Sequence, residues 1–267
     1  MMPFRGAMLP GGSGRGQDRW DATRTAAIVL DGASSFTPGT ADASRYVDFL
    51  LREIASRIAE GGDLRTVLGT AIRVVSDELD LRPGASPSST VLLAREQAER
   101  LEVLALGDST AVVKTNDGTT HRISDDRLSR TATEIRHRYR ERLQNGSGYD
   151  DEHRSLLGEL QHHERRHRNI PDGYWIAETD PEAAQQAVCC QFETSEVAWC
   201  VLATDGAQRV IDHLGLRWES VAHMQDHELA ELLQRLHDWE QFEDPTAKFL
   251  PRAKQHDDKV LVTWTRQ

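Results

Sequence analysis

The stretch Ala26-Ala27-Ile28-Val29-Leu30-Asp31-Gly32-Ala33-Ser34-Ser35 is the best starting point for interpreting this chain. Five apolar residues run directly into an Asp-Gly pair, and an unbroken apolar run bounded by turn signals predicts a buried strand. A carboxylate at the end of such a strand needs a partner, because an unpaired buried charge is costly. The glycine allows a sharp turn and leaves its carbonyl accessible. Asp-Gly is also a common turn dipeptide, so this stretch alone leaves a functional site and an ordinary turn both open.

The same pattern returns twice later in the chain. Residues 197–204 form a second apolar strand pattern that runs into Asp205-Gly206, and Asp257-Asp258 stand immediately before a third, 260–264. Three carboxylate sites at strand ends can converge on one edge of a sheet or sandwich. Oxygen-only ligands suit hard cations such as Mg²⁺ or Mn²⁺, and two such ions can activate water and stabilise a phosphoryl transition state.

Composition excludes several classes of function. The chain has 267 residues, of which 38% are hydrophobic and 28% charged, and a net charge of -11. An acidic chain argues against binding to nucleic acid or to an anionic membrane, so neither is an expected partner. The three cysteines, Cys189, Cys190 and Cys200, form neither a disulfide framework nor a zinc motif. Together with the lack of a membrane-length apolar run, this predicts a cytoplasmic protein.

The order of local patterns predicts one domain over 17–267, after a flexible leader over 1–16. Amphipathic spacing predicts helices over 41–60 and from Asp63 to about 79, with Asp63 as the N-cap. Strand signals follow, and short separators predict that the first three are antiparallel neighbours. These strand signals lie at 90–94, 101–106, 110–115 and 187–192.

The segment from about Asp125 to Arg168 differs from the rest in being dense in arginine and histidine. It has few apolar anchors, and Gly146 and Gly148 divide it into two weak helices that should lie over the fold. Its histidines could suggest a metal, but exposed charge-rich helices are usually only solvated.

Six short motifs, taken in order, resemble the metal-dependent protein phosphatases of the protein phosphatase 2C (PPM) family, in a divergent bacterial-type form. They are Gln17-Asp18, Asp31-Gly32-Ala33-Ser34-Ser35, Ser89-Thr90, Gly107-Asp108-Ser109, Ala203-Thr204-Asp205-Gly206 and Asp257-Asp258. The resemblance is good in the strands and poor across about 120–185. It implies an α+β fold, a four-layer αββα sandwich with two central antiparallel sheets.

The resemblance also implies a site with two Mn²⁺ or Mg²⁺ ions and a water or hydroxide as nucleophile. By analogy, Asp31 bridges both metals, the Gly32 carbonyl binds one of them, and Asp205 and Asp257 hold the other; these three aspartates are the expected catalytic residues. Asp18 is expected in the outer shell, and Asp108 beside a third, weaker metal.

Several positions depart from the family pattern. Gln17 stands where the family usually has Glu, and Ser13 stands where it has a phosphate-binding arginine. Arg15 or Arg19 could substitute for that arginine. Arg209 replaces an aspartate that often supports the third metal.

Three functions remain open at this stage. The resemblance implies a hydrolase that removes phosphate from phosphoserine or phosphothreonine of a phosphorylated protein. The missing arginine favours the alternative of a weak or inactive phosphatase-like regulatory module, whereas the retained aspartates favour an enzyme. The third is a soluble sandwich with ordinary turns.

If the chain is an enzyme, the arginine-rich segment is expected to be a mobile cover that selects acidic or phosphorylated protein segments, because guanidinium groups bind phosphate well. The alternative is a solvated hairpin.

Overall fold

The computed structural model describes residues 4–33 and 42–266, so Ser34, Ser35 and the predicted loop at 37–40 lie outside the described residues. The strands are β1 (Phe4–Leu9), β2 (Arg19–Ala22), β3 (Ala26–Ala33), β4 (Ser88–Gln97), β5 (Arg100–Leu106), β6 (Thr110–Thr115), β7 (Thr120–Ile123), β8 (Val188–Glu193), β9 (Val197–Ala203) and β10 (Lys259–Thr265). The helices are α1 (Ala43–Ile58), α2 (Leu64–Glu78), α3 (Arg127–Arg130), α4 (Thr133–Gln144), α5 (Asp151–Arg166), α6 (Asp205–His213), α7 (Trp218–Ala222) and α8 (Asp226–Asp238), with short helical turns η1 (Pro181–Gln186), η2 (Thr194–Glu196) and η3 (Trp239–Glu243).

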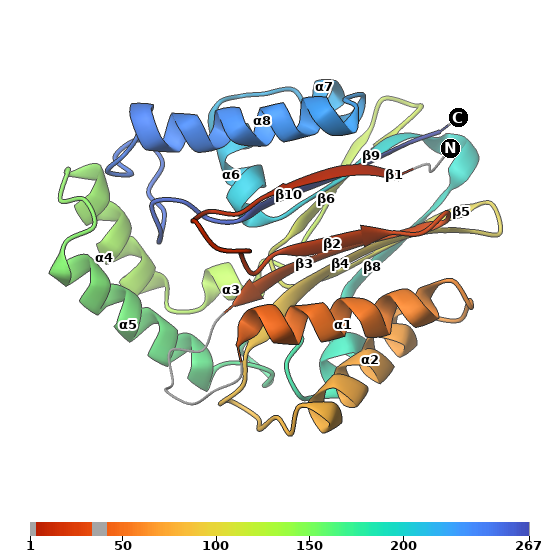
Figure 1. The fold of residues 1–267 in the computed structure, drawn as a ribbon, viewed down its shortest axis with the longest axis horizontal. Coiled ribbons are helices and arrows are strands. Elements are labelled where there is room, and N and C mark those ends of the chain that lie inside the picture. Colours follow the sequence, from red (N-terminus) through yellow and green to blue (C-terminus); the bar gives the residue numbers. More distant parts are fainter. Residues whose placement is uncertain (1–3, 34–41, 267) are drawn as a thin grey trace.

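Two five-stranded antiparallel sheets form the centre of the molecule. Their strand orders are β1-β10-β9-β6-β7 and β2-β3-β4-β5-β8. In Figure 1, α1 and α2 cover the outer face of the second sheet, while α6, α7 and α8 lie on the far side of the first. The predicted αββα sandwich is therefore confirmed.

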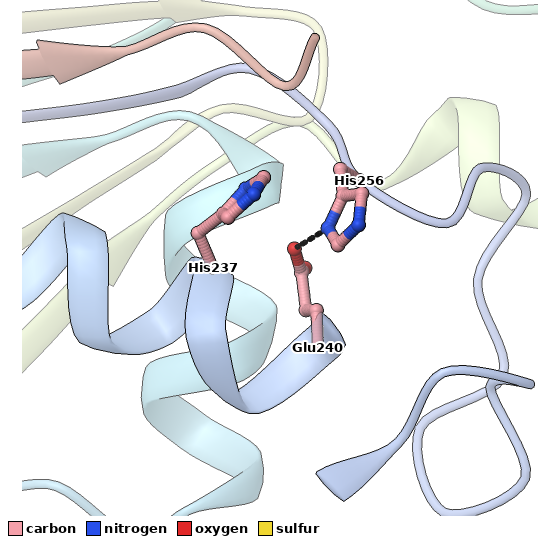
Figure 2. A group of neighbouring side chains, drawn as sticks. All are labelled: His237, Glu240 and His256. Carbon is pink, nitrogen blue, oxygen red and sulfur yellow. Dashed lines mark hydrogen bonds and ion pairs between the residues drawn. The ribbon is translucent and has the colours of Figure 1, made fainter. Parts of the chain in front are cut away.

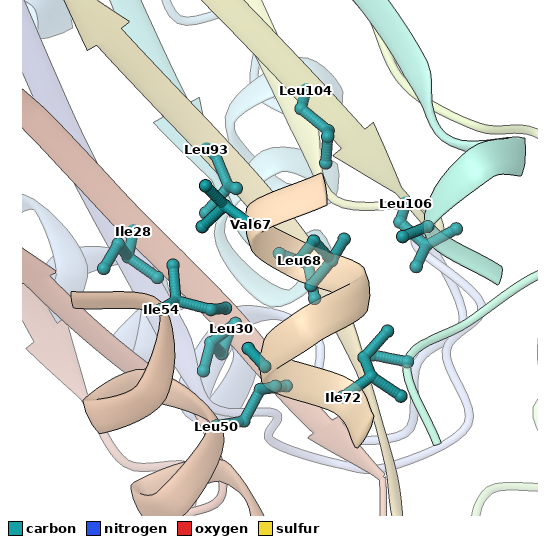
Figure 3. Packing of buried hydrophobic residues seen from close by; sticks show 14 of the residues in the cluster. Ile28, Leu30, Leu50, Ile54, Val67, Leu68, Ile72, Leu93, Leu104 and Leu106 are labelled. Atoms are coloured by element: carbon teal, nitrogen blue, oxygen red, sulfur yellow. The ribbon is translucent and has the colours of Figure 1, made fainter. Parts of the chain in front are cut away.

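Strand β3 shows why its sequence is continuously apolar. Ile28 and Leu30 point into the core shared with α1 and α2 (Figure 3), whereas Ala27 and Val29 join the core between the two sheets. Because successive side chains point to opposite faces of a strand, a strand buried on both faces needs apolar residues at every position.

The two predicted helices after β3 are confirmed. In α1, the buried residues Tyr46, Leu50 and Ile54 recur at the four-residue spacing that keeps one helical face against the sheet. Helix α2 begins where expected, because the Asp63 side chain accepts a hydrogen bond from the Thr66 N–H at 3.1 Å.

The flexible leader predicted over 1–16 is wrong for residues 4–9. These residues form β1, an edge strand that pairs with β10 from Phe4–Trp264 to Leu9–Lys259. The Gly6 N–H donates to the Asp226 carboxylate at 3.0 Å. The sequence FRGAML carries only a weak strand pattern, and the strand is held by a partner at the other end of the chain.

The predicted neighbours 101–106 and 110–115 lie in different sheets. Strand β5 pairs with β4 and β8, whereas β6 pairs with β7 and β9. The chain crosses between sheets at Gly107, whose φ is +87°. A Cβ at this position would also lie 2.9 Å from Thr90 Cβ, so only glycine fits here. Because β5 and β6 belong to different sheets, the short separator between them is a crossing from one sheet to the other and not a hairpin.

The arginine-rich segment forms α3, α4 and α5, and the predicted division near Gly146 and Gly148 is confirmed. In Figure 1, α4 and α5 stand beside one end of the sandwich. They share a small core of their own that includes Ile135, Tyr139 and Leu160. Among the described residues, no helix has the length and apolar character that crossing a membrane requires.

Candidate metal centre

A cavity of about 660 Å³ opens at one end of the sandwich. It is bounded by the glycine-rich loop around 11–17, the end of β3, the first turn of α6, the loop 250–258, and faces of α4 and α5. All of the aspartates singled out in the sequence, apart from Asp18, are among its lining residues. The predicted convergence of strand-end carboxylates is confirmed.

Asp31 is held inside the sheet, not at a turn. It lies in β3 opposite Thr90, and its carbonyl accepts a hydrogen bond from Ser89 Oγ at 3.1 Å. Burial, and then the charges of the neighbouring aspartates led by Asp18 and Asp205, raise the pKa of the Asp31 carboxyl well above its ordinary value.

Glycine after Asp31 is required by close packing. β3 continues through Gly32 to Ala33, so the sharp turn expected there is absent. A Cβ at Gly32 would lie 2.6 Å from the Gln17 carbonyl oxygen and 2.9 Å from Val47 Cγ1. The glycine therefore lets the end of the strand approach the 11–17 loop.

Asp205 is the first residue of α6, directly after the N-cap Thr204. A carboxylate in the first turn is stabilised by the helix dipole. Thr204 Oγ1 accepts the Val260 N–H at 2.9 Å, which joins β9 and β10 at this point. A Cβ at Gly206 would clash with the carbonyl oxygen of Asp258, so this glycine too serves a close approach.

The adjacent aspartates 257 and 258 have different partners. The Asp258 carboxylate accepts backbone N–H groups of Gly11, at 2.6 Å, and of Gln17. Asp257 instead pairs with Lys254, with Nζ 2.8 Å from Oδ1. Burial raises the pKa of Asp257, as does the charge of Asp205, and the Lys254 ammonium only partly offsets this.

Asp18 and Asp108 complete the acidic set. Asp18 is 2% exposed, and its Oδ2 is buried without a hydrogen-bond partner among the described residues. Burial and the charges of Asp257 and Asp258 raise its pKa well above the ordinary value. Burial and Asp205 likewise raise the pKa of Asp108 to about 7, although the guanidinium groups of Arg136 and Arg209 lower it.

These carboxylates fit divalent cations. Several buried acidic groups repel one another, and Asp18 Oδ2 among them has no hydrogen-bond partner in the described structure. A bound cation would offset this repulsion and accept the carboxylate oxygens as ligands. The carboxylate oxygens of these aspartates lie farther apart than the ligand atoms of a formed coordination shell. In the described part of the chain, the group whose ligand atoms all lie within 4.8 Å of one another is a different one, His237, Glu240 and His256.

Three of the described arginines line the cavity, Arg136, Arg209 and Arg252, and none of them belongs to the predicted pair. Arg209 Nη1 lies 3.9 Å from Asp205 Oδ2, and its Nη2 donates to the Pro251 carbonyl at 2.7 Å. Arg136 of α4 pairs with Glu164 of α5.

The predicted phosphate-binding pair lies elsewhere. Arg15 has a side chain that is 82% exposed, and Arg19 is buried in an ion pair with Asp48 at 2.6 Å. Neither of these lines the cavity, and their role in phosphate binding stays a prediction.

Sequence reasoning missed Lys254, Arg136 and the histidine group. Lys254 stands three residues before Asp257 without a motif of its own. His237 and Glu240 have an i, i+3 spacing that brings side chains to one helical face, but His256 joins them only through the fold.

Comparison with known proteins identifies the family. The family model for protein phosphatase 2C matches residues 14–265. The chain belongs to the protein phosphatase 2C family. The predicted family resemblance is thus confirmed, although no curated protein sequence matches.

Solved structures share this fold at low sequence identity. The serine/threonine phosphatase Stp1 from Staphylococcus aureus has a TM-score of 0.59 at 15% identity, covering 100% of this chain and 96% of that one. PppA of Pseudomonas aeruginosa, described as a regulatory component of T6SS, has a TM-score of 0.56 at 18% identity, covering 98% of each chain. The catalytic domain of the phosphatase PstP, in complex with two manganese ions, has a TM-score of 0.51 at 14% identity, covering 98% of this chain and 96% of that one.

Proposed function

We propose that this chain is a Mn²⁺- or Mg²⁺-dependent phosphatase that removes phosphate from phosphoserine and phosphothreonine of proteins in the cytoplasm. The observation that carries the proposal is the convergence of Asp31, Asp108, Asp205 and Asp257 at one cavity, with Asp18 buried near enough for its charge to raise the pKa of Asp31. Family membership and the two manganese ions of the PstP structure support it.

The aspartates would hold two cations, with Asp31 shared between them, the Gly32 carbonyl on one, and Asp205 and Asp257 on the other. Bound there, such ions supply an activated water and offset charge on the phosphoryl group. Asp18 does not line the cavity, but its buried Oδ2 has no hydrogen-bond partner in the described structure, and from the outer shell it would orient water.

The cavity arginines would take over the task of the missing upstream arginine. The Arg209 guanidinium is anchored by the Pro251 carbonyl, with its Nη1 directed to the Asp205 side. Arg136 faces the cavity from α4. Guanidinium groups bind two phosphate oxygens at once, so this pair can orient the phosphoryl group.

One observation favours the alternative of a weak or inactive binding module. Lys254 Nζ lies 2.8 Å from Asp257 Oδ1, and Arg209 lies near Asp205. These cations compete with metal for two of the predicted ligands. In this alternative, the cavity binds phosphorylated protein segments without turnover.

Hydrolysis of an aryl phosphate and of a phosphothreonine peptide distinguishes the two. We expect activity that EDTA abolishes and Mn²⁺ restores. Asp205→Asn should reduce it by several orders of magnitude without unfolding the protein. The matched control is Asp117→Asn in the β6–β7 hairpin, where the carboxylate bonds only with Thr115 and Thr119. Activity that survives exhaustive chelation would contradict the two-metal mechanism, and phosphopeptide binding without hydrolysis would favour the module.

A further inference from the structure

Three metal-ligating side chains meet beside the loop segment that carries Asp257. His237 comes from α8, Glu240 from the helical turn that follows it, and His256 from the loop before β10 (Figure 2). One ligand atom of each lies within 4.8 Å of the others. The family resemblance does not involve these residues, and the proposed phosphatase mechanism does not use them.

Glu240 is a buried carboxylate with one oxygen already committed. Its side chain is 2% exposed, and Oε2 accepts from Lys259 Nζ at 2.7 Å and from His256 Nδ1 at 3.2 Å. The other oxygen, Oε1, has the Arg252 Nε at 3.9 Å, which is beyond hydrogen-bond distance. Glu240 can therefore keep Lys259 on one oxygen and offer the other to a cation.

The two imidazoles are suited to coordination. They stack with ring centroids 4.1 Å apart and planes at 28°. His237 Nδ1 is buried without a hydrogen-bond partner among the described residues. Burial, together with neighbouring positive charge, lowers the pKa of both histidines below the ordinary value.

We propose that His237, Glu240 and His256 bind one Zn²⁺ ion at a site separate from the aspartate cluster. Two histidines and one glutamate are a known zinc ligand set that leaves a fourth position for water. Imidazole nitrogens favour zinc, whereas all-oxygen sites favour Mg²⁺ or Mn²⁺. Tetrahedral donors at the usual zinc distances lie about 3.3 Å apart, and the ligand atoms of these three side chains lie within 4.8 Å of one another.

The surrounding charges predict moderate affinity. Lys259 and Arg252 lie against the group, and they balance the buried carboxylates of Glu240 and Asp244. An added divalent cation is repelled by both. The repulsion is partly compensated because Glu240 and His256 line the same cavity as the acidic set.

Zinc at this position would act on the loop that carries Asp257. His256 precedes Asp257 directly, and Lys259 Nζ, besides pairing with Glu240, donates to the Asp257 carbonyl at 3.0 Å. Bound zinc would thus hold the start of β10, and with it the backbone of Asp257, in place.

The test uses the full chain with the aspartate cluster disabled by D31N and D205N, so the result does not depend on phosphatase activity. After chelation and its removal, Zn²⁺ is titrated by calorimetry, and Co²⁺ is used as a probe of tetrahedral geometry by absorption. We expect one equivalent of zinc, bound more tightly than about 100 µM. Loss of a group that merely orients a ligand costs about 10- to 100-fold in affinity, so H237A and H256A should each cost at least that.

The matched control is H227A, an exposed histidine on the same helix α8, which should leave zinc affinity unchanged. Circular dichroism checks the fold of each variant, and H256Q in the loop provides the test should H237A fail to fold. The proposal is overturned if the D31N/D205N protein binds no zinc. It is equally overturned if H237A, H256A and H256Q bind as tightly as H227A, or if H227A weakens binding as much as they do.

Discussion

Replacing Asp108 with Asn should stabilise the protein in EDTA, and more so at high pH. The ordinary pKa of this carboxyl is 3.8, and burial together with the charge of Asp205 raises it to about 7 in the folded protein. Between pH 3.8 and about 7, the Asp108 carboxyl keeps its proton in the folded chain and has lost it in the unfolded chain. The free energy of unfolding therefore falls as pH rises from 3.8 to about 7, and stays at its lowest above that.

The size of the effect follows from the same values. They differ by about 3 pH units, and about 1.4 kcal/mol per unit gives a ceiling of about 4 kcal/mol. Asp108 is only partly buried, so water screens the repulsion and we expect about half of this. For a chain of this length, about 2 kcal/mol corresponds to a rise in Tm of about 4–8 °C.

The assay is urea unfolding of both proteins in EDTA at pH 5 and pH 8.5, repeated with Mn²⁺. The stability gain of D108N should be larger at pH 8.5, and Mn²⁺ should stabilise the wild-type chain more than the variant, because the cation attracts the carboxylate that the variant lacks. The matched control is D117N. Hydrogen bonds from Thr115 and Thr119 lower the pKa of Asp117, so removing its charge should not stabilise the protein at either pH. An equal D108N effect at both pH values would refute the assigned repulsion.

Three further results are expected. Arg209→Ala should raise KM for an aryl phosphate by about 10-fold or more, since a hydrogen bond to a charged group is worth about 1.5–3 kcal/mol; an unchanged KM in steady-state kinetics would remove Arg209 from phosphate binding. Glu240→Gln should lower the free energy of unfolding by about 3–5 kcal/mol, because it leaves the buried Lys259 without its counter-charge; urea denaturation measures this, with the exposed Glu231→Gln on α8 as control. Replacing 127–166 with a Gly/Ser linker removes Arg136 from the cavity, so it should weaken aryl phosphate hydrolysis and reduce phosphoprotein turnover much more; equal effects on both substrates would argue against a role in substrate selection.

Most arginines of the segment from Asp125 to Arg168 already have carboxylate partners, which bears on the hypothesis that this segment is a cover for substrate. Arg127, Arg130, Arg138 and Arg142 all pair with carboxylates of their own segment. Arg136 also has such a partner, Glu164, but it faces the cavity. The pairs of Arg130 and Arg138 are exposed on both sides, where ion pairing is weak, so a phosphorylated segment can still compete for these two arginines. The role in substrate selection remains a proposal.

Local patterns were enough to predict most elements and the convergence of the strand-end aspartates. The strands at 26–30, 197–203 and 260–264 are visible because burial on both faces demands continuous apolar residues. The helix start at Asp63 is visible because capping involves residues only three positions apart. These features depend on neighbours along the chain, which the sequence shows directly.

Tertiary structure alone decided which distant residues meet. The pairing of β1 with β10, and the bond from Gly11 to Asp258 across 247 positions, leave no local signal, since each partner looks ordinary by itself. The sequence shows the glycine at 206 only as part of an Asp-Gly pair, whereas the structure requires it because α6 packs against Asp258. Likewise, the histidine group exists only because the loop before β10 folds back onto the end of α8. Such contacts depend on how the layers stack, and stacking is determined by the shape of the whole core rather than by any one segment of sequence.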